Sequence, residues 1–186
     1  MTGRQGAPRA LLDGALALLG RFWLRRCRVV GEGTVALGRI WVRGEGTIRI
    51  GKRVVLDARH APIELVVPYE GSEIVLGDDV VIEGGTSIEA DRSIRIGDRT
   101  HIGRFCRLMD SHFHPLRGDR NQRPPAAPVV VENDVEMGER AILLAGSHVE
   151  HHVVVHPGTV ITRRVRAHAA VRGVPAQVVV AGGATP

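Results

Sequence analysis

The hydrophobic residues of this chain recur every six positions over its C-terminal half. Between residues 131 and 165, each sixth position is aliphatic, and a small or β-branched residue lies four positions after each one. The aliphatic series is Val131, Met137, Leu143, Val149, Val155 and Ile161, and the second series is Val135, Ala141, Ser147, Val153, Thr159 and Val165. An alternating strand has a period of two and an α-helix a period of 3.6, so neither produces this pattern. The repeat predicts an all-β solenoid, a left-handed parallel β-helix in which three six-residue sides close one triangular coil.

The same template is present upstream, and one polar segment interrupts it. It occurs at Leu76, Ile82 and Ile88, and after a two-residue slip it continues at Ile96, Ile102 and Leu108. Residues 30–75 carry weaker repeats, with an irregular stretch near residues 57–62. Residues 109–128 are polar, contain four prolines and break the repeat entirely. We therefore expect a loop extruded from one corner of the solenoid, which is a natural place for function.

The N-terminal segment has a helical rather than a six-residue pattern. Residues 8–27 are predicted to form an amphipathic helix whose apolar side chains lie on one stripe. That stripe comprises Leu11, Leu12, Ala15, Leu18, Leu19, Phe22 and Trp23. Covering the open first coil is the favoured role of this helix. Binding to a membrane surface, helped by Arg21, Arg25 and Arg26, is the less favoured alternative.

These patterns divide the chain into three parts. The expected parts are a helical cap over residues 1–29, a β-helix domain over residues 30–180 and a disordered tail over residues 181–186. The chain after Val171 no longer follows the template, so we expect it to be irregular.

Composition and charge exclude several classes of protein. The formal net charge is +5, but the basic residues are scattered and aromatic residues make up only 3% of the chain, so nucleic-acid binding is not expected. The two cysteines form no CxxC motif, which favours a reducing cytoplasm over a disulfide framework. No apolar run is long enough for a membrane-spanning helix, and the N-terminus does not resemble a signal peptide.

The polar loop contains the residues best suited to chemistry. Asp110, His112 and His114 lie close together within it. A histidine on such a loop can act as a general base near neutral pH, and a nearby carboxylate can fix its tautomer.

These repeats and this loop resemble a known family, the hexapeptide-repeat acyltransferases. Within that family the nearest resemblance is to the sugar O-acetyltransferases, which include maltose, galactoside and colanic-acid acetyltransferase-like proteins. The resemblance extends over about residues 30–180. Besides the repeats, it rests on the loop segments 110–115 and 123–128 and on the C-terminal segments 158–163 and 171–176.

The resemblance implies an acetyl-CoA-dependent enzyme that acetylates a hydroxyl of a sugar or sugar-containing acceptor. It implies a homotrimer in which acetyl-CoA, the co-substrate, lies in a groove between two subunits, with no metal. His114 would be the general base, with His112 as its rival and Asp110 as the residue that fixes the tautomer. The residues implied to hold the co-substrate are Glu139, Ala145, Pro157, Gly158, Thr162, Arg163, Arg164 and Arg172.

Three positions depart from the family pattern. Relatives often have asparagine, a donor to the developing oxyanion, where this chain has Glu83, and an ionised glutamate cannot donate. Relatives usually have tryptophan at the position of Glu136 and arginine at that of Gln177. We therefore keep an alternative, in which the chain is a trimeric scaffold or ligand-binding protein with an altered site.

The remaining histidines suggest one further alternative. His148, His151, His152 and His156 resemble the zinc ligands of the γ-class carbonic anhydrases, which would make the protein a metal-dependent lyase. A solvated, histidine-rich corner is the favoured interpretation, because three of the four occupy outward positions of the template.

Isolated histidines and the cysteine at position 106 receive simpler interpretations. His60, His101 and His168 are interpreted as isolated residues. Cys106 occupies a small inward position, so it is predicted to be a packed core thiol.

Overall fold

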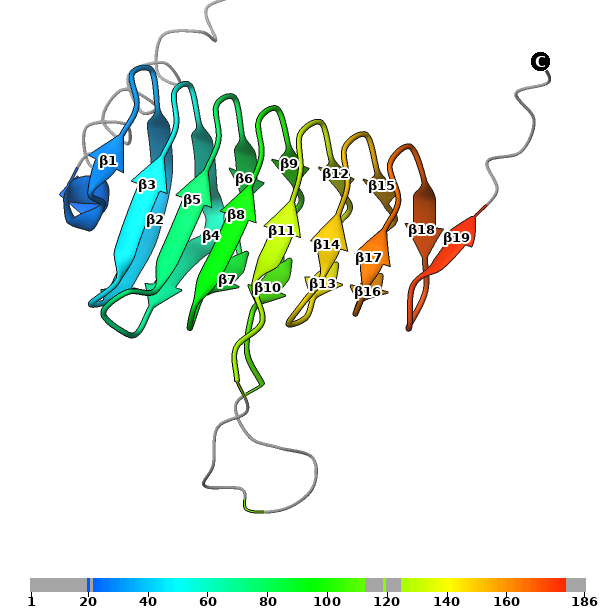
Figure 1. Ribbon diagram of the computed structural model, residues 1–186. Coiled ribbons are helices and arrows are strands. Elements are labelled where there is room, and N and C mark those ends of the chain that lie inside the picture. The colour runs from blue at the N-terminus through cyan, green and yellow to red at the C-terminus, as the bar shows by residue number, and fades with distance from the viewer. Residues whose placement is uncertain (1–19, 21, 113–118, 120–124, 180–186) are drawn as a thin grey trace, which may run out of the picture.

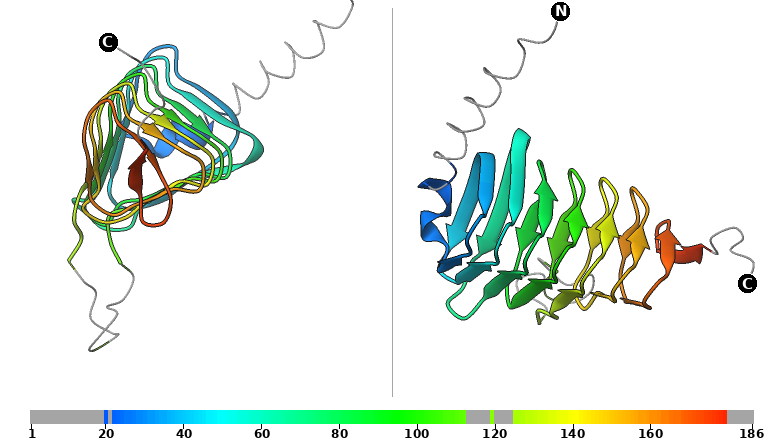
Figure 2. Two further views of the ribbon diagram at one scale, coloured as in Figure 1. Left: turned by 90° about the vertical axis from the view of Figure 1, so that its right-hand side faces the viewer. Right: turned by 90° about the horizontal axis from the view of Figure 1, so that it is seen from above.

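The chain folds as a parallel β-solenoid of about seven turns. The computed structural model describes residues 20, 22–112, 119 and 125–179, and Figure 1 shows their short strands stacked coil upon coil. Figure 2 looks along the axis and shows that each coil is roughly triangular. The strands form one sheet of seven and one of twelve, and every described strand pair is parallel except β18 with β19. The predicted solenoid is confirmed, whereas its left-handed sense remains a prediction.

Three faces make up the prism. Face 1 is the seven-stranded sheet, which comprises β1 (Val29–Val30), β3 (Thr47–Ile50), β5 (Glu73–Leu76), β8 (Ser93–Ile96), β11 (Val129–Val131), β14 (His148–Val149) and β17 (Arg164–Val165). Face 2 contains β6 (Val81–Glu83), β9 (His101–Ile102), β12 (Glu136–Met137), β15 (Val154–Val155) and β18 (Ala170–Arg172). Face 3 contains β7 (Ser87–Glu89), β10 (Arg107–Met109), β13 (Ile142–Leu143) and β16 (Val160–Ile161).

Two long strands join faces 2 and 3 into the twelve-stranded sheet. They are β2 (Val35–Gly44) and β4 (Val55–Val67), which pair with each other. The first residues of β4 pair with β6 on face 2, and its last residues pair with β7 on face 3. The corners therefore define three edges, which we call edge 1–2, edge 2–3 and edge 3–1 after the faces they join.

Aliphatic side chains fill the interior of the prism. All six residues of the series that begins at Val131 are at most 1% exposed, as the template predicts. The small or β-branched series is also buried, and its most exposed member, Val165, is 6% exposed. Burying each such aliphatic side chain stabilises the fold by roughly 1.5–3 kcal/mol, so stacking of coils supplies the core that no single coil has.

Left-handed backbone conformations turn the chain at edge 1–2. Six residues of this corner have φ between 53° and 60°, namely Arg53, Asp79, Arg99, Asp134, His152 and His168. Aspartate and asparagine side chains link successive coils there, because Asp78, Asp98 and Asn133 each accept a backbone N–H from the preceding coil at 2.8 Å. These bonds satisfy corner N–H groups that no strand ladder can reach.

One segment agrees with the sequence-based expectation and one differs from it. The stretch near residues 57–62 is irregular, as predicted, because β4 runs through it but its register against β2 shifts between Gly38 and Ile40. The chain after Val171 is more regular than predicted, since β19 (Gln177–Val179) turns back and pairs antiparallel with β18. This hairpin covers the edge of β18 on face 2, which would otherwise be the last strand of that face.

Most of the predicted N-terminal helix lies outside the described residues. Gly20, Phe22 and Trp23 have helical backbone, and a 3₁₀ turn, η1 (Leu24–Arg26), follows them. The predicted tail, residues 181–186, also lies outside the described residues. Within the described part of the chain, no helix combines the length and the apolar character that crossing a membrane requires.

Candidate functional site

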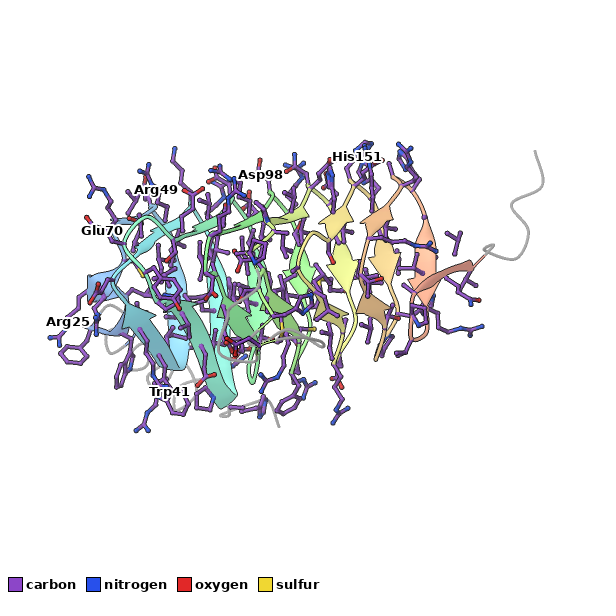
Figure 3. The ribbon with its side chains drawn as sticks, turned by 60° about the horizontal axis from the view of Figure 1, so that its bottom comes forward. Arg25, Trp41, Arg49, Glu70, Asp98 and His151 are labelled. Carbon is purple, nitrogen blue, oxygen red and sulfur yellow. The ribbon has the colours of Figure 1, made fainter. Side chains whose placement is uncertain are left out.

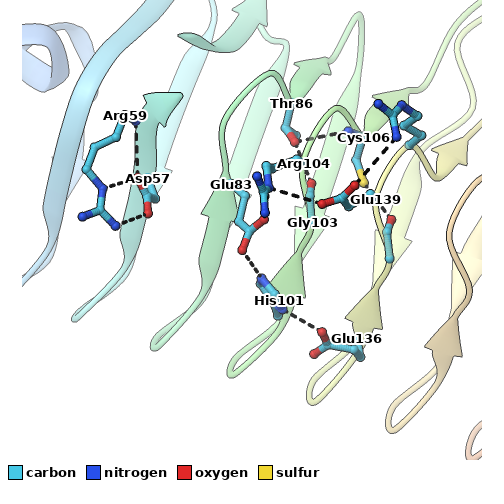
Figure 4. A network of polar contacts seen from close by, with 12 residues as sticks. Asp57, Arg59, Glu83, Thr86, His101, Gly103, Arg104, Cys106, Glu136 and Glu139 are labelled. Atoms are coloured by element: carbon cyan, nitrogen blue, oxygen red, sulfur yellow. Dashed lines mark hydrogen bonds and ion pairs between the residues drawn. The ribbon is translucent and has the colours of Figure 1, made fainter. Parts of the chain in front are cut away.

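A cluster of charged side chains lies at edge 2–3, where β6, β9 and β12 end or begin. We call it the edge 2–3 cluster, and it comprises Glu83, His101, Arg104, Glu136 and Glu139 (Figure 4). The Nδ1 atom of His101 lies 2.7 Å from Glu136 Oε1, and its Nε2 atom lies 3.3 Å from Glu83 Oε1. The Nε atom of Arg104 lies 3.3 Å from carboxylate oxygens of both Glu83 and Glu139.

His101 is therefore not an isolated residue, and that interpretation is wrong. Both of its ring nitrogens face carboxylate oxygens, which accept hydrogen bonds but cannot donate them when ionised. A neutral imidazole has a single N–H, so His101 donates to Glu83 and Glu136 simultaneously only when both nitrogens carry protons. The cluster thus places an imidazole and the Arg104 guanidinium next to Glu83, at the position where an oxyanion donor is expected.

Arg104 connects two residues to which the sequence assigned different roles. Glu83 belongs to the predicted catalytic set and Glu139 to the predicted co-substrate set, and one guanidinium bridges them. Sequence reasoning missed both Arg104 and His101. A partial signal existed for His101, because the aliphatic template repeats at Ile82 and Ile102, which places His101 opposite Val81 and one outward position away from Glu83.

A small polar hollow adjoins this cluster. Its volume is about 130 Å³, and its lining residues are Asp57, His60, Glu83, Gly84 and Arg104. Asp57 is held by Arg59 at 2.6 Å, and the hydrogen bond from Arg59 lowers the pKa of the Asp57 carboxyl below its ordinary value. The hollow can therefore present the Asp57 carboxylate and the Arg104 guanidinium to the polar groups of a small ligand.

The base of the extruded loop is built on Asp110, at edge 3–1. Asp110 is fully buried, and its carboxylate accepts three backbone N–H groups, from Asp91 at 2.7 Å, Arg92 at 2.8 Å and Ser93 at 2.7 Å. The role expected for Asp110, fixing the tautomer of a loop histidine, stays a prediction. The described contacts instead make Asp110 the anchor of the corner from which the loop leaves.

The two candidate bases follow this anchor. His112 is described and exposed, whereas His114 lies outside the described residues. The other end of the loop returns to the same corner, because Ala127 donates to the Asp110 carbonyl at 2.8 Å and accepts from Gly146 at 2.9 Å. The loop therefore begins and ends at edge 3–1, whereas Glu83 belongs to edge 2–3.

The predicted co-substrate residues also divide between these two edges. Glu139, Pro157, Gly158 and Arg172 lie along edge 2–3, where Gly158 donates to the Glu139 carbonyl at 2.8 Å. Ala145, Thr162, Arg163 and Arg164 lie along edge 3–1. Both groups border face 3, but one chain does not gather them at one edge.

Arg164 is less available to a phosphate than the sequence suggests. Its guanidinium pairs with Glu150, whose other oxygen accepts the Ala167 N–H at 2.8 Å. The bond from Ala167 and then the contact with Arg164 lower the pKa of Glu150 below its ordinary value. Arg163 and Arg172 have no ion pair among the described residues, so they are the better candidates for binding an anion.

Three members of the second histidine group lie together, because the His151 ring also lies edge-on to His152, with centroids 5.5 Å apart. His148 and His151 contact the two oxygens of Glu132, at 2.7 Å and 3.1 Å, and their hydrogen bonds lower the pKa of that carboxyl. His152 stacks on His168 with ring centroids 5.0 Å apart, so His168 is not isolated either.

His156 does not belong to this group, because it follows β15 at edge 2–3. Over residues 20, 22–112, 119 and 125–179, no three His, Cys, Asp or Glu side chains are arranged to hold a metal ion. The four histidines that suggested a lyase therefore do not form one cluster in this chain.

Cys106 is a core thiol, as predicted. It is fully buried, its Sγ atom lies 3.2 Å from the Gly138 carbonyl, and burial raises the pKa of the thiol to about 11. A thiol of this kind is a poor nucleophile near neutral pH.

Part of the chain is similar in sequence to known acetyltransferases. No protein-family model matches the chain. A 56-residue stretch, 30% of the chain, is 45% identical to a 2,3,4,5-tetrahydropyridine-2,6-dicarboxylate N-acetyltransferase from Enterococcus faecalis, and 41% identical to the enzyme of that name from Staphylococcus aureus. The match spans only about a quarter of the length of these relatives, 24% and 23%.

Solved structures agree with the fold over most of the chain. A variant of AntD, an N-acyltransferase from Bacillus cereus bound to dTDP-4-amino-4,6-dideoxyglucose and coenzyme A, superposes with a TM-score of 0.71 at 15% identity over 86% of each chain. The hexapeptide-repeat acetyltransferase VCA0836 from Vibrio cholerae gives 0.63 at 20% identity, covering 95% of this chain and 94% of that one.

A third structure is more distant. PerB from Caulobacter crescentus, bound to CoA and GDP-perosamine, gives a TM-score of 0.57 at 18% identity and covers 78% of this chain and 56% of that one. At these identities the superpositions show the fold. Together with the matched stretch, they confirm the predicted resemblance to the hexapeptide-repeat acyltransferases.

Proposed function

We propose that this chain is an acyl-CoA-dependent acyltransferase that transfers an acetyl group to a sugar-linked acceptor. One observation carries the proposal: hexapeptide coils and a histidine-bearing loop occur together in a chain whose sequence and fold match proteins of this chemistry. AntD and PerB are described with a coenzyme A and a nucleotide-linked sugar bound, which supports a sugar-linked acceptor here. The left-handed sense of the coils is part of this proposal.

In the proposed reaction, His114 is the general base and no acyl-enzyme forms. His114 accepts the proton of an acceptor hydroxyl, whose oxygen attacks the thioester carbonyl carbon of acetyl-CoA. The tetrahedral intermediate then collapses, the carbon–sulfur bond breaks, and the CoA thiolate leaves and takes up a proton. A histidine suits this role because its pKa lies near the working pH.

Glu83 does not supply the oxyanion donor in this scheme. As an acceptor it contacts His101 and Arg104, so the Arg104 guanidinium and an N–H of the His101 ring are the proposed hydrogen-bond donors at edge 2–3. Because the loop and the edge 2–3 cluster occupy different edges, the proposal includes a homotrimer in which one copy supplies the loop and its neighbour supplies edge 2–3. Arg163 and Arg172 are the cations proposed to meet the phosphates of the co-substrate.

Substitution of the two loop histidines tests this proposal. We expect His114→Ala to lower the rate of CoA thiol release at least about 100-fold with a sugar-linked acceptor, since general-base catalysis contributes on that order. His112→Ala, the matched control, should retain most of the activity. Hydroxylamine should cleave an O-acetyl product but not an N-acetyl product. Wild-type turnover by His114→Ala would remove the proposed base, and a hydroxylamine-resistant product would make the enzyme an N-acyltransferase.

The altered scaffold is the second candidate, and the contacts of Glu83 favour it. A carboxylate that His101 and Arg104 already hold contributes no donor to acyl transfer. Calorimetry with CoA distinguishes the two, because a scaffold with a lost site gives no saturable heat, whereas the proposed enzyme binds CoA through its unpaired arginines.

A further inference from the structure

Aromatic and arginine side chains gather at the first-coil end of the molecule. We call this set the aromatic–arginine patch, and it comprises Phe22, Trp23, Arg25, Arg26, Arg39, Trp41 and Arg43. The aromatic members and three of the arginines surround a hollow of about 200 Å³ between η1 and β2. Trp23 and Trp41 are the two tryptophans of the chain. Figure 3 labels Arg25 and Trp41 at this end, with Arg49 on a different face.

Each aromatic ring of the patch has a guanidinium close to it. The Cζ atom of Arg25 lies 4.1 Å from the centroid of the Phe22 ring, and that of Arg43 lies 5.1 Å from Trp41. Phe22 is nevertheless 51% exposed. The patch therefore presents apolar rings and positive charge at the same surface.

The arginines of the patch lack the carboxylate partners that arginines have elsewhere. In the described part of the chain, none of the four forms an ion pair, and Arg26 donates only to the Gly44 carbonyl at 3.3 Å. Arginines of the middle coils are paired, as Arg53 is with Asp79 and Arg99 with Asp134. Glu64 lies opposite Trp41 in the β2–β4 register and Glu45 follows Arg43 by two residues, so the four arginines outnumber these carboxylates.

We propose that the aromatic–arginine patch binds the surface of an anionic lipid bilayer. Unpaired guanidinium groups are attracted to anionic headgroups, and indole rings prefer the boundary between headgroups and acyl chains. In the sequence, the amphipathic pattern of residues 8–27 ends at the patch, because Phe22 and Trp23 belong to both. The solenoid would then stand on the membrane by its first-coil end.

Vesicle binding by the full-length protein tests the proposal. Vesicles of phosphatidylcholine mixed with phosphatidylglycerol should sediment the protein and shift its tryptophan emission to shorter wavelength. Because both tryptophans lie in the patch, this emission reports on the patch alone. Each basic residue near an anionic surface strengthens binding about fivefold, so Arg25→Glu with Arg43→Glu should weaken it at least about 25-fold.

A matched variant controls for net charge. Arg49→Glu with Lys52→Glu makes the same change of charge on and beside face 1, and it should bind vesicles almost as well as the unaltered protein. Circular dichroism verifies that both variants keep the fold. Equal loss of binding in the two variants, or equal binding to pure phosphatidylcholine, would overturn the proposal. So would competition by duplex DNA that removes the vesicle signal at equal phosphate concentration, since the patch would then be a general polyanion site.

Discussion

The anchor of the extruded loop offers the sharpest test of the structure. Asp110 accepts three backbone N–H bonds, and a hydrogen bond to a charged acceptor contributes about 1.5–3 kcal/mol. The three donors lie at partly exposed positions and share one carboxylate, so their contributions are not additive. We expect Asp110→Ala to lower the free energy of unfolding by about 3–5 kcal/mol.

The amide variant gives an intermediate expectation. Asp110 Oδ2 accepts from Arg92 and Ser93, while Oδ1 accepts from Asp91 alone. Asp110→Asn can keep the first two bonds and turn its NH₂ towards the third donor, so its cost should be about 2–3 kcal/mol, roughly half that of alanine.

Asp98→Ala is the matched control for these variants. Asp98 Oδ1 accepts a single corner N–H, that of Asp78, so its loss should cost about 1.5 kcal/mol, the lower end of the range for one charged acceptor. Urea unfolding followed by far-UV circular dichroism measures all three variants. If Asp110→Ala destabilised the protein no more than Asp98→Ala does, the carboxylate would not be the anchor of the loop.

Two other predictions follow from the pKa values of buried or paired groups. Because hydrogen bonds lower the pKa of Glu132, its stabilisation is present above the unfolded-state value of about 4.5 and is lost as the pH falls through the folded-state value. Glu132→Gln should therefore lower the urea midpoint at neutral pH and converge with the unaltered protein in acid, and an offset independent of pH would contradict this. In a Cys27→Ser background, Cys106 should react with a thiol reagent far more slowly in the folded protein than in urea, because burial raises its pKa to about 11. Equal rates of Cys106 modification in the folded and the urea-unfolded protein would show that the core is accessible to the reagent.

The six-residue period was sufficient to predict which side chains fill the prism. Positions such as Leu143 and Ile161 are fully buried, because the triangular coil returns every sixth residue to the interior. The boundaries of the extruded loop could also be predicted from the sequence, since the strand before the loop ends at Met109 and the next one is Val129–Val131. These features depend on local sequence alone, because each side of a coil obeys the same rule.

The outward side chains were harder to predict, because their partners lie in neighbouring coils. Glu83 and His101 are 18 residues apart, but their coil has 20 residues because of the two-residue slip, so they meet diagonally and His101 lies opposite Val81. Glu136 is 35 residues from His101, since the loop is inserted between their coils, and no fixed spacing connects the two. The sequence by itself therefore determined the solenoid and its core, which a local repeat encodes. Only the tertiary structure decided which charged residues meet at each edge. Insertions change the number of residues between two successive coils, whereas the distance between the stacked coils stays the same.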